Sequence, residues 1–473
     1  MKVRLVVLGG RKGKDAKRDI GASCFLLLVE ACGRTYTSMI DIGMESIEGE
    51  GVSWRGPIEL ARLPEFSMLD GIFLTHAHRD HAAALFLEAV RSRMKKDAQV
   101  FCTRPTGAFL DYVGSDQIAV SKKKRERAPY TTRDIFWMTD KSRLRLVMKP
   151  EIIDLVPGVI RVLVNRPGHM RGACYFIFEI TEGEKVFRVM FSGDYCVHDQ
   201  MTTRGAELPP PGWSPDAVVF DCTNGSEDLI PWKDEIKRMA DQGHNTIKSG
   251  HHFLIYAFAM DRCQTFARTL ADLGLPVWMD GPSAIKLASV LTSAEGFWCE
   301  GDHPFSMSGI NICDYPGEPL ERTEASAIVT PSGMGHALAA EYILELIGQE
   351  EVVIGAAGYQ AYGTNGFKVA NSKQGDKIKL LVDRPVEGEP NEWRTEVVEV
   401  TVAAKCEQYR ATGHSLRREG ADHAEQLLSR SPSPAFIGTH ANTRALDWFE
   451  KCLSGGAMRT FRTDRDRDIV LAE

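Results

Sequence analysis

The sequence predicts an α/β protein in which a part rich in antiparallel strands is followed by a doubly wound unit. Two observations predict this class. Short apolar runs of strand length are interspersed with helical patterns over the first 225 residues, and from about Glu227 helices and strands alternate regularly. The length of 473 residues allows two or three domains.

In the first part, eight apolar runs bounded by turn residues are expected to be strands. They are Lys2–Gly9, Ser23–Glu30, Thr35–Ile42, Gly71–Thr75, Val159–Val164, Cys174–Ile180, Lys185–Phe191 and Ala217–Asp221. Three helical patterns lie between them, at Ala82–Lys96, Thr106–Ala119 and Thr132–Asp140. Gly183 marks a hairpin turn between two of the runs, so part of this sheet structure is antiparallel.

The second part alternates helix and strand, which is typical of a doubly wound sheet. The expected elements are Trp232–Gln242, Phe253–Ala257, Cys263–Leu273, Val277–Asp280, Pro282–Leu291, Ala327–Pro331, His336–Leu346 and Val352–Ala356. A polar stretch, Val382–Arg394, then leads to a strand at Val397–Val402. The predicted division is 1–225, 226–404 and 405–473, with the middle segment inserted between two parts of one domain.

The amino-acid composition excludes some classes of protein and of function. Hydrophobic residues make up 43% and charged residues 26% of the chain, as in ordinary folded proteins. The net charge of −7 gives no overall field that would attract nucleic acid, so such contact needs a local patch, and Lys122–Arg127 is the one dense basic run. Eleven cysteines without a CxxC pattern indicate reduced thiols and a cytoplasmic location. We expect neither a signal peptide nor contact with a membrane, because no apolar run reaches about 18 residues.

The strongest functional signal is the run THAHRDH at residues 75–81, which follows an expected strand. In extended chain, residues i and i+2 project to the same side, so His76 and His78 can bind one ion, while Asp80 and His81 face a second. Imidazole nitrogens and carboxylate oxygens suit zinc in sites that keep a position open for water.

Further ligands are expected at other strand ends. His169 follows Val159–Val164, and Asp194 follows Lys185–Phe191, where it could bridge two ions. Asp41 also ends a strand, and we expect it to orient the histidine loop without binding metal.

These motifs resemble a known family. DIGM with Asp41, THAHRDH, GHMRGACYF with His169 and FSGDY with Asp194 resemble the four motifs of the metallo-β-lactamase fold. The later motifs resemble its β-CASP branch, nucleic-acid hydrolases that include ribonuclease J and the cleavage-and-polyadenylation endonuclease. They are FDCTNG, YAFAMDRCQ, WMDGPSA, PSGMG and GYQAYGTNG. The resemblance implies an αββα sandwich interrupted by a doubly wound β-CASP domain.

The resemblance also implies roles for individual residues. It assigns one zinc ion to His76, His78 and His169, and a second to Asp80, His81 and His440, with Asp194 bridging and Asp80 also counted as catalytic. A histidine at position 440 is typical of RNA-cleaving members. Asp221 matches the residue that orients a proton-donating histidine, for which His414 is the best candidate and His423 a rival.

The expected function is hydrolysis of single-stranded RNA by a two-zinc mechanism that leaves a 5′-phosphate and a 3′-hydroxyl. Arg262 and the backbone N–H groups of Ser332 and Gly333 are the expected substrate contacts. A homodimer, endonuclease action and 5′ exonuclease action all stay open.

Some residues depart from the family pattern. The chain has ATGHSL around His414 where the family has Phe-Ser-Ala-His-x-Asp, and Asp261 stands where glycine is usual. The alternatives are a DNA-processing nuclease, a non-catalytic partner subunit and a small-molecule hydrolase of the wider fold.

Overall fold

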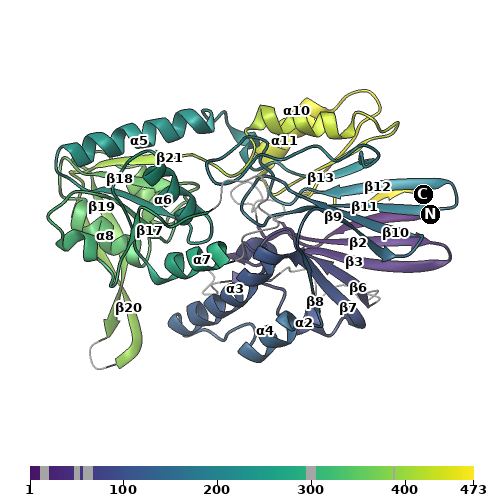
Figure 1. The fold of residues 1–473 in the computed structure, drawn as a ribbon, viewed down its shortest axis with the longest axis horizontal. Coiled ribbons are helices and arrows are strands. Elements are labelled where there is room, and N and C mark those ends of the chain that lie inside the picture. Colours follow the sequence, from purple (N-terminus) through teal and green to yellow (C-terminus); the bar gives the residue numbers. More distant parts are fainter. Residues whose placement is uncertain (11–20, 47–53, 57–67, 294–304, 387–388) are drawn as a thin grey trace.

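The computed structural model describes residues 1–10, 21–46, 54–56, 68–293, 305–386 and 389–473, and its main part is a sandwich of two seven-stranded sheets (Figure 1). The first sheet has the order β24 (Asp468–Ala472), β1 (Lys2–Val7), β2 (Cys24–Ala31), β3 (Arg34–Ile42), β6 (Leu69–Phe73), β7 (Met94–Thr103) and β8 (Leu144–Val147). The second has the order β23 (Arg459–Arg462), β22 (Ala435–Thr439), β13 (Ala217–Asp221), β12 (Lys185–Phe191), β11 (Tyr175–Glu182), β10 (Ile160–Asn165) and β9 (Glu151–Val156). All eight strands expected in this part are present. A short ladder joins β4 (Glu45–Ser46) to β5 (Trp54–Arg55).

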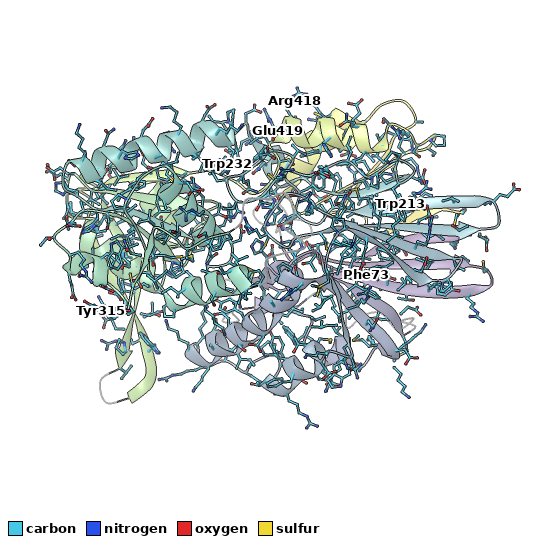
Figure 2. The ribbon with its side chains drawn as sticks, viewed as in Figure 1. Phe73, Trp213, Trp232, Tyr315, Arg418 and Glu419 are labelled. Atoms are coloured by element: carbon cyan, nitrogen blue, oxygen red, sulfur yellow. The ribbon has the colours of Figure 1, made fainter. Side chains whose placement is uncertain are left out.

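The two sheets pack face to face around one apolar core. Phe73 of β6 lies in this core (Figure 2). Its ring stacks on Phe101 of β7 at a centroid distance of 4.6 Å and meets Phe178 of β11 edge-on at 4.8 Å. Aromatic pairs of this kind join the two layers and stabilise the sandwich.

Helices cover both outer faces of the sandwich, which gives four αββα layers (Figure 1). The first sheet is covered by α1 (Arg79–Ala82), α2 (Glu88–Arg91), α3 (Arg104–Lys123) and α4 (Thr132–Thr139). The second is covered by α10 (Arg417–Leu428) and α11 (Thr443–Leu453), with the short η3 (Thr223–Ser226) beside them. None of the described helices is long and apolar enough to cross a membrane.

The prediction of a single helix over Ala82–Lys96 is wrong. In the structure α1 ends at Ala82, the only helix within the segment is the four-residue α2, and β7 begins at Met94. Residues 82–86 are buried on every side, so packing decides their conformation, and there is no apolar stripe to favour one long helix.

The inserted unit is built on a parallel six-stranded sheet, as the alternation of helix and strand predicts. Its order is β16 (Ile310–Ile312), β15 (Val277–Met279), β17 (Ala327–Pro331), β14 (Phe253–Ala257), β18 (Val353–Ala357) and β21 (Lys405–Tyr409). The helices of this unit are α5 (Trp232–Lys248), α6 (Arg262–Asp272), α7 (Pro282–Ser293), α8 (Leu338–Leu346), α9 (Asn365–Ala370) and the short η4 (Glu318–Glu321). A projecting hairpin, β19 (Lys377–Val386) and β20 (Glu389–Thr401), includes much of the stretch expected to be polar loop (Figure 1).

The pairing of β13 with β22 identifies the insertion. These strands are parallel neighbours, with Ala217 opposite Ala435, although more than 200 residues separate them in the chain. The chain therefore leaves the sandwich after β13 and returns to the adjacent strand. We propose the division 1–225, 226–409 and 410–473, which moves the second boundary from 404, because β21 pairs with β18 in the inserted sheet.

Candidate metal centre

All seven predicted metal ligands follow the carboxyl ends of strands, five of them in loops and two, Asp80 and His81, in the short helix α1. His76, His78, Asp80 and His81 follow β6, while His169, Asp194 and His440 follow β10, β12 and β22. Because β12, β13 and β22 are mutually parallel, their carboxyl ends meet at one edge of the second sheet. The fold therefore brings residues that lie up to 364 positions apart, from 76 to 440, into one group.

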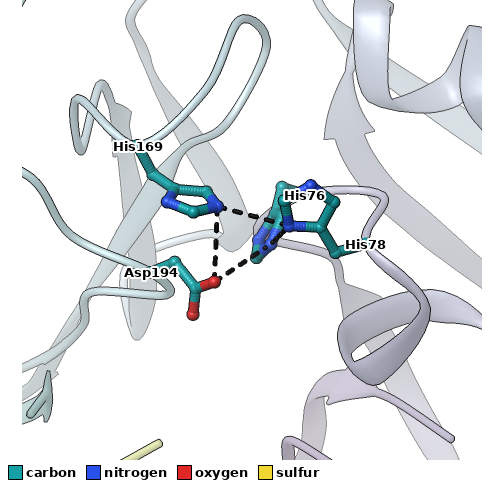
Figure 3. A group of neighbouring side chains, drawn as sticks. All are labelled: His76, His78, His169 and Asp194. Atoms are coloured by element: carbon teal, nitrogen blue, oxygen red, sulfur yellow. Dashed lines mark hydrogen bonds and ion pairs between the residues drawn. The ribbon is translucent and has the colours of Figure 1, made fainter. Parts of the chain in front are cut away.

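The first cluster consists of three histidines and one carboxylate (Figure 3). Nδ1 of His78 lies 3.0 Å from Nε2 of His76 and 3.3 Å from Nε2 of His169. Oδ2 of Asp194 lies 3.4 Å from Nε2 of both His76 and His169. Four ligand atoms thus surround one point.

The second cluster shares Asp194 with the first. Its other oxygen, Oδ1, lies 3.0 Å from Nε2 of His81 and 3.4 Å from Nδ1 of His440. Oδ2 of Asp80 lies 3.1 Å from Nε2 of His440. Asp194 therefore presents one oxygen to each cluster, which is the arrangement of a bridging ligand.

The residues fit two cations. The tetrahedral zinc bonds of about 2.0–2.1 Å that histidine makes require ligand atoms about 3.3 Å apart, close to the spacing in the first cluster. Oδ1 of Asp194 is buried and makes no hydrogen bond with the described residues, although Nε2 of His81 lies 3.0 Å from it. An orphaned carboxylate oxygen costs free energy in a protein interior, and a bound cation would remove that cost.

The protonation states of the first cluster suit metal binding, whereas in the second cluster the carboxylates, led by Asp194, outweigh burial and raise the pKa of His81 well above its usual range and that of His440 to about 10. Burial lowers the pKa of His76 to about 3 and the pKa of His169 well below its usual range, so both imidazoles are neutral. Burial raises the pKa of Asp194, but the histidines around it, led by His440 and His81, outweigh burial and hold that pKa well below its usual range. Neutral imidazole and ionised carboxylate are the forms that bind metal.

Neighbouring groups hold the histidine rings in place. Asp41 receives a hydrogen bond of 2.8 Å from Nδ1 of His81 and two of 2.7 Å from the backbone N–H and hydroxyl of Thr75. The Thr75 hydroxyl in turn lies 3.1 Å from Nδ1 of His76. Asp41 thus contacts His81 and Thr75, and its role in orienting the ligands stays a prediction. Nδ1 of His169 donates to the carbonyl oxygen of Gly413 at 2.8 Å.

His414 and Asp221 form a pair beside the clusters. Nδ1 of His414 donates to Oδ2 of Asp221 at 2.6 Å, and Nε2 lies 3.9 Å from Oδ2 of Asp194. Burial raises the pKa of Asp221, but His414 outweighs burial and holds it well below its usual range, so Asp221 is ionised. The rival His423 lies elsewhere, with Nε2 3.0 Å from the hydroxyl of Tyr195.

One side of the centre is open to solvent. The side chains of His76, His81, His169, Asp194 and His440 are at most 6% exposed. Those of Asp80 and His414 are 39% and 17% exposed. Solvent therefore reaches the centre from the side of Asp80 and His414.

The structure corrects the expectation for Arg262. Its side chain is only 10% exposed, and its guanidinium donates to Oε1 of Gln200 at 2.8 Å, to the carbonyl oxygen of His169 at 3.1 Å and to Asp261. A guanidinium buried in this way holds the loop of a metal ligand and is not presented to a phosphate.

The helix expected over His336–Leu346 begins at Leu338 in the structure, so Ser332 and Gly333 lie in the loop before it. The hydroxyl of Ser332 accepts the backbone N–H of His336 at 3.1 Å, and the carbonyl oxygen of Gly333 accepts from Gln360 at 2.8 Å. Contact of Ser332 and Gly333 with substrate stays a prediction.

Two residues of the site were missed by the sequence analysis. The side chain of Gln200 donates to the carbonyl oxygens of Gly168 and His169, at 2.8 and 3.0 Å. Nothing in the sequence around Gln200 signals this. The hydroxyl of Thr223 lies 2.8 Å from Nδ1 of His440 and donates to Asp221 at 2.5 Å. Its position two residues after Asp221, within FDCTNG, could have indicated it.

An αββα sandwich with a His/Asp centre at its strand ends and an inserted parallel unit is the architecture of the metallo-β-lactamase β-CASP nucleases. The comparisons with known proteins support this class. The chain is 24% identical to the transcription termination factor FttA of Methanothermobacter thermautotrophicus, over 99% of this chain and 71% of that protein. It is 30% identical to the cleavage and polyadenylation specificity factor subunit 3-I of Arabidopsis thaliana, over 49% of this chain and 34% of that protein. It is 27% identical to the endoribonuclease YSH1 of Saccharomyces cerevisiae, over 52% of this chain and 30% of that protein.

No protein-family model matches the chain. The chain spans half or less of the length of most of the curated relatives it matches.

Proposed function

We propose that the protein is a zinc-dependent ribonuclease that hydrolyses phosphodiester bonds of single-stranded RNA and leaves a 5′-phosphate and a 3′-hydroxyl. The observation that carries the proposal is the position of Asp194, which offers one oxygen to each of two ligand clusters. Relatives named as endoribonuclease and as cleavage factor support RNA as the substrate.

The proposed ligands are His76, His78 and His169 for one ion and Asp80, His81 and His440 for the other, with Asp194 between them. Two zinc ions held there would supply a water of lowered pKa and would stabilise negative charge on the phosphate. The neutral imidazoles and ionised carboxylate described above match this use.

His414 is the proposed proton donor to the 3′ oxygen that leaves. Asp221 accepts the proton on Nδ1 and so fixes the ring, which leaves Nε2 directed at the centre on its solvent side. A protonated His414 can therefore donate from Nε2 to the leaving oxygen. Asp221 acts through His414 and is a positioning residue.

A cytoplasmic location agrees with the cysteines, since the ten in the described part of the chain are all free. Whether the chain forms a homodimer stays a prediction.

The proposal is tested by incubating zinc-loaded protein with 5′-labelled single-stranded RNA and with DNA of the same sequence. Cleavage of the RNA supports the proposal, and the lengths of the early fragments distinguish endonuclease from 5′ exonuclease action. Preferential cleavage of DNA would support the DNA-processing alternative, and two intact strands would indicate a non-catalytic subunit.

A further inference from the structure

Three exposed aromatic side chains follow two adjacent strands of the inserted sheet. Phe258 comes directly after β14 and is 37% exposed, while Tyr359 and Tyr362 follow β18 and are 53% and 83% exposed. β14 and β18 are parallel neighbours, so these loops leave the same edge of the sheet. Ligands of doubly wound sheets bind beyond the carboxyl ends of the strands.

The loops that carry these rings are packed together. A Cβ atom on Gly333 would lie 3.0 Å from Cδ1 of Phe258, so that ring lies directly against the PSGMG loop. The backbone N–H of Ala361 donates to Sδ of Met334 in the same loop at 3.3 Å. The ring of Tyr362 meets Phe367 edge-on at a centroid distance of 5.1 Å. The loops that carry Phe258, Tyr359 and Tyr362 thus pack together, and we call these three exposed rings the aromatic platform.

The aromatic platform is connected to the metal centre by two short segments of chain. The loop that begins at Phe258 continues to Arg262, whose guanidinium donates to the carbonyl oxygen of His169. On the other side, the backbone N–H of Gly358 donates to the carbonyl oxygen of Tyr409 at 2.9 Å, five residues before His414. The loops of the platform are therefore joined to the loops that carry His169 and His414.

Basic side chains lie beside the platform. Burial lowers the pKa of His336 in the PSGMG loop, and Lys123, Lys124 and Lys368 are close enough to lower it further, while Asp383 opposes them. Lys123 forms an ion pair with Asp383 at 2.7 Å, and Lys124 at the end of α3 is exposed. Three lysines against one aspartate leave a local positive charge on a protein whose net charge is −7.

We propose that unpaired bases of the RNA next to the scissile phosphate stack on the aromatic platform of Phe258, Tyr359 and Tyr362, while Lys124 and its neighbours face the phosphates. This proposal rests on the proposed function. Stacking on aromatic rings tolerates any base, since every base has a π face, so binding should depend on the presence of bases and little on their sequence.

The test compares Tyr362→Ala with Tyr362→Phe, which keeps the ring, and with Phe136→Ala, which removes another exposed ring, 68% exposed, on α4. Binding is measured by fluorescence anisotropy with a uridine decamer and with an abasic decamer, both with phosphorothioate linkages that slow hydrolysis. Tyr362→Ala should weaken binding of the uridine decamer about 5- to 150-fold and leave the abasic decamer nearly unchanged. Tyr362→Phe and Phe136→Ala should bind both like the wild type.

An equal affinity of Tyr362→Ala and the wild type for the uridine decamer would overturn the platform, and so would an equal loss on both decamers. Cleavage of labelled RNA by the wild type, measured in parallel, keeps the two proposals separate. If cleavage is present and the base-dependent loss is absent, only the platform fails. If the wild type does not cleave RNA, the proposed function fails.

Discussion

Nδ1 of His414 donates a hydrogen bond of 2.6 Å to the carboxylate of Asp221, across 193 positions of sequence. This pair lies at the solvent side of the two ligand clusters, where a leaving group would depart.

If His414 is the proton donor, its substitution should affect turnover and leave zinc binding unchanged. His414→Ala should retain zinc, because His414 is outside both proposed ligand sets, and should lower turnover on RNA by about 10²–10⁴, the usual effect of losing a general acid. Steady-state cleavage of labelled RNA and elemental analysis measure the two quantities. His423→Ala is the matched control, since His423 contacts Tyr195 and should leave turnover unchanged. The reverse pattern would show that His423 is the donor.

Because Asp194 faces both clusters, we expect its substitution to lower zinc affinity at both proposed metal sites. Asp194→Asn removes the negative charge that both sites share and replaces one carboxylate oxygen with an amide nitrogen, which cannot bind a cation, so zinc affinity should fall at both clusters. Isothermal titration of metal-free protein with zinc would measure both sites. Loss of one site with the other unchanged would contradict a bridging role.

We expect substitution of Asp41 to lower zinc affinity less than substitution of Asp194, and at the second site only. Asp41→Asn removes the charged acceptor of His81 Nδ1, so the second site should lose about 10- to 100-fold in zinc affinity, the usual effect of changing a residue behind a ligand. Asparagine tolerates the positive φ of 52° at this position, so the backbone should keep its conformation. The same zinc titration checks this prediction. An unchanged affinity would mean that Asp41 does not position His81.

Arg262 and Lys124 should differ in the salt dependence of RNA binding. Each phosphate neutralised on a single strand contributes about −0.7 to the slope of log affinity against log salt. Lys124→Gln should therefore make the slope shallower by about that amount. Arg262→Gln should leave the slope unchanged and lower turnover, because the buried guanidinium holds the His169 loop. If Arg262→Gln changed the slope as Lys124→Gln is expected to, Arg262 would be a phosphate contact.

Much of the fold follows from sequence pattern, because the apolar runs of the sandwich strands and the helix–strand alternation of the insert are local signals. The prediction of a helix over Ala82–Lys96 failed because residues 82–86 are all buried, and burial by distant elements leaves no local periodicity in the sequence. The candidate metal clusters could be predicted in part because four of their members stand in one run of six residues, 76–81.

The partners of Arg262 could not be predicted in the same way. Its contacts, Gln200 and the carbonyl oxygen of His169, lie 62 and 93 positions away, and only the packing of the inserted unit against the sandwich brings them together. The sequence around a single arginine does not indicate whether its guanidinium faces solvent or the protein interior.

The central claim is that two metal ions share Asp194. Anomalous diffraction at the zinc absorption edge, from crystals of zinc-saturated protein, tests it most directly. The account predicts two peaks about 3.5–4 Å apart, one among His76, His78 and His169 and the other among Asp80, His81 and His440, with Asp194 between them. A single peak at saturation, or a second peak away from Asp194, would contradict it.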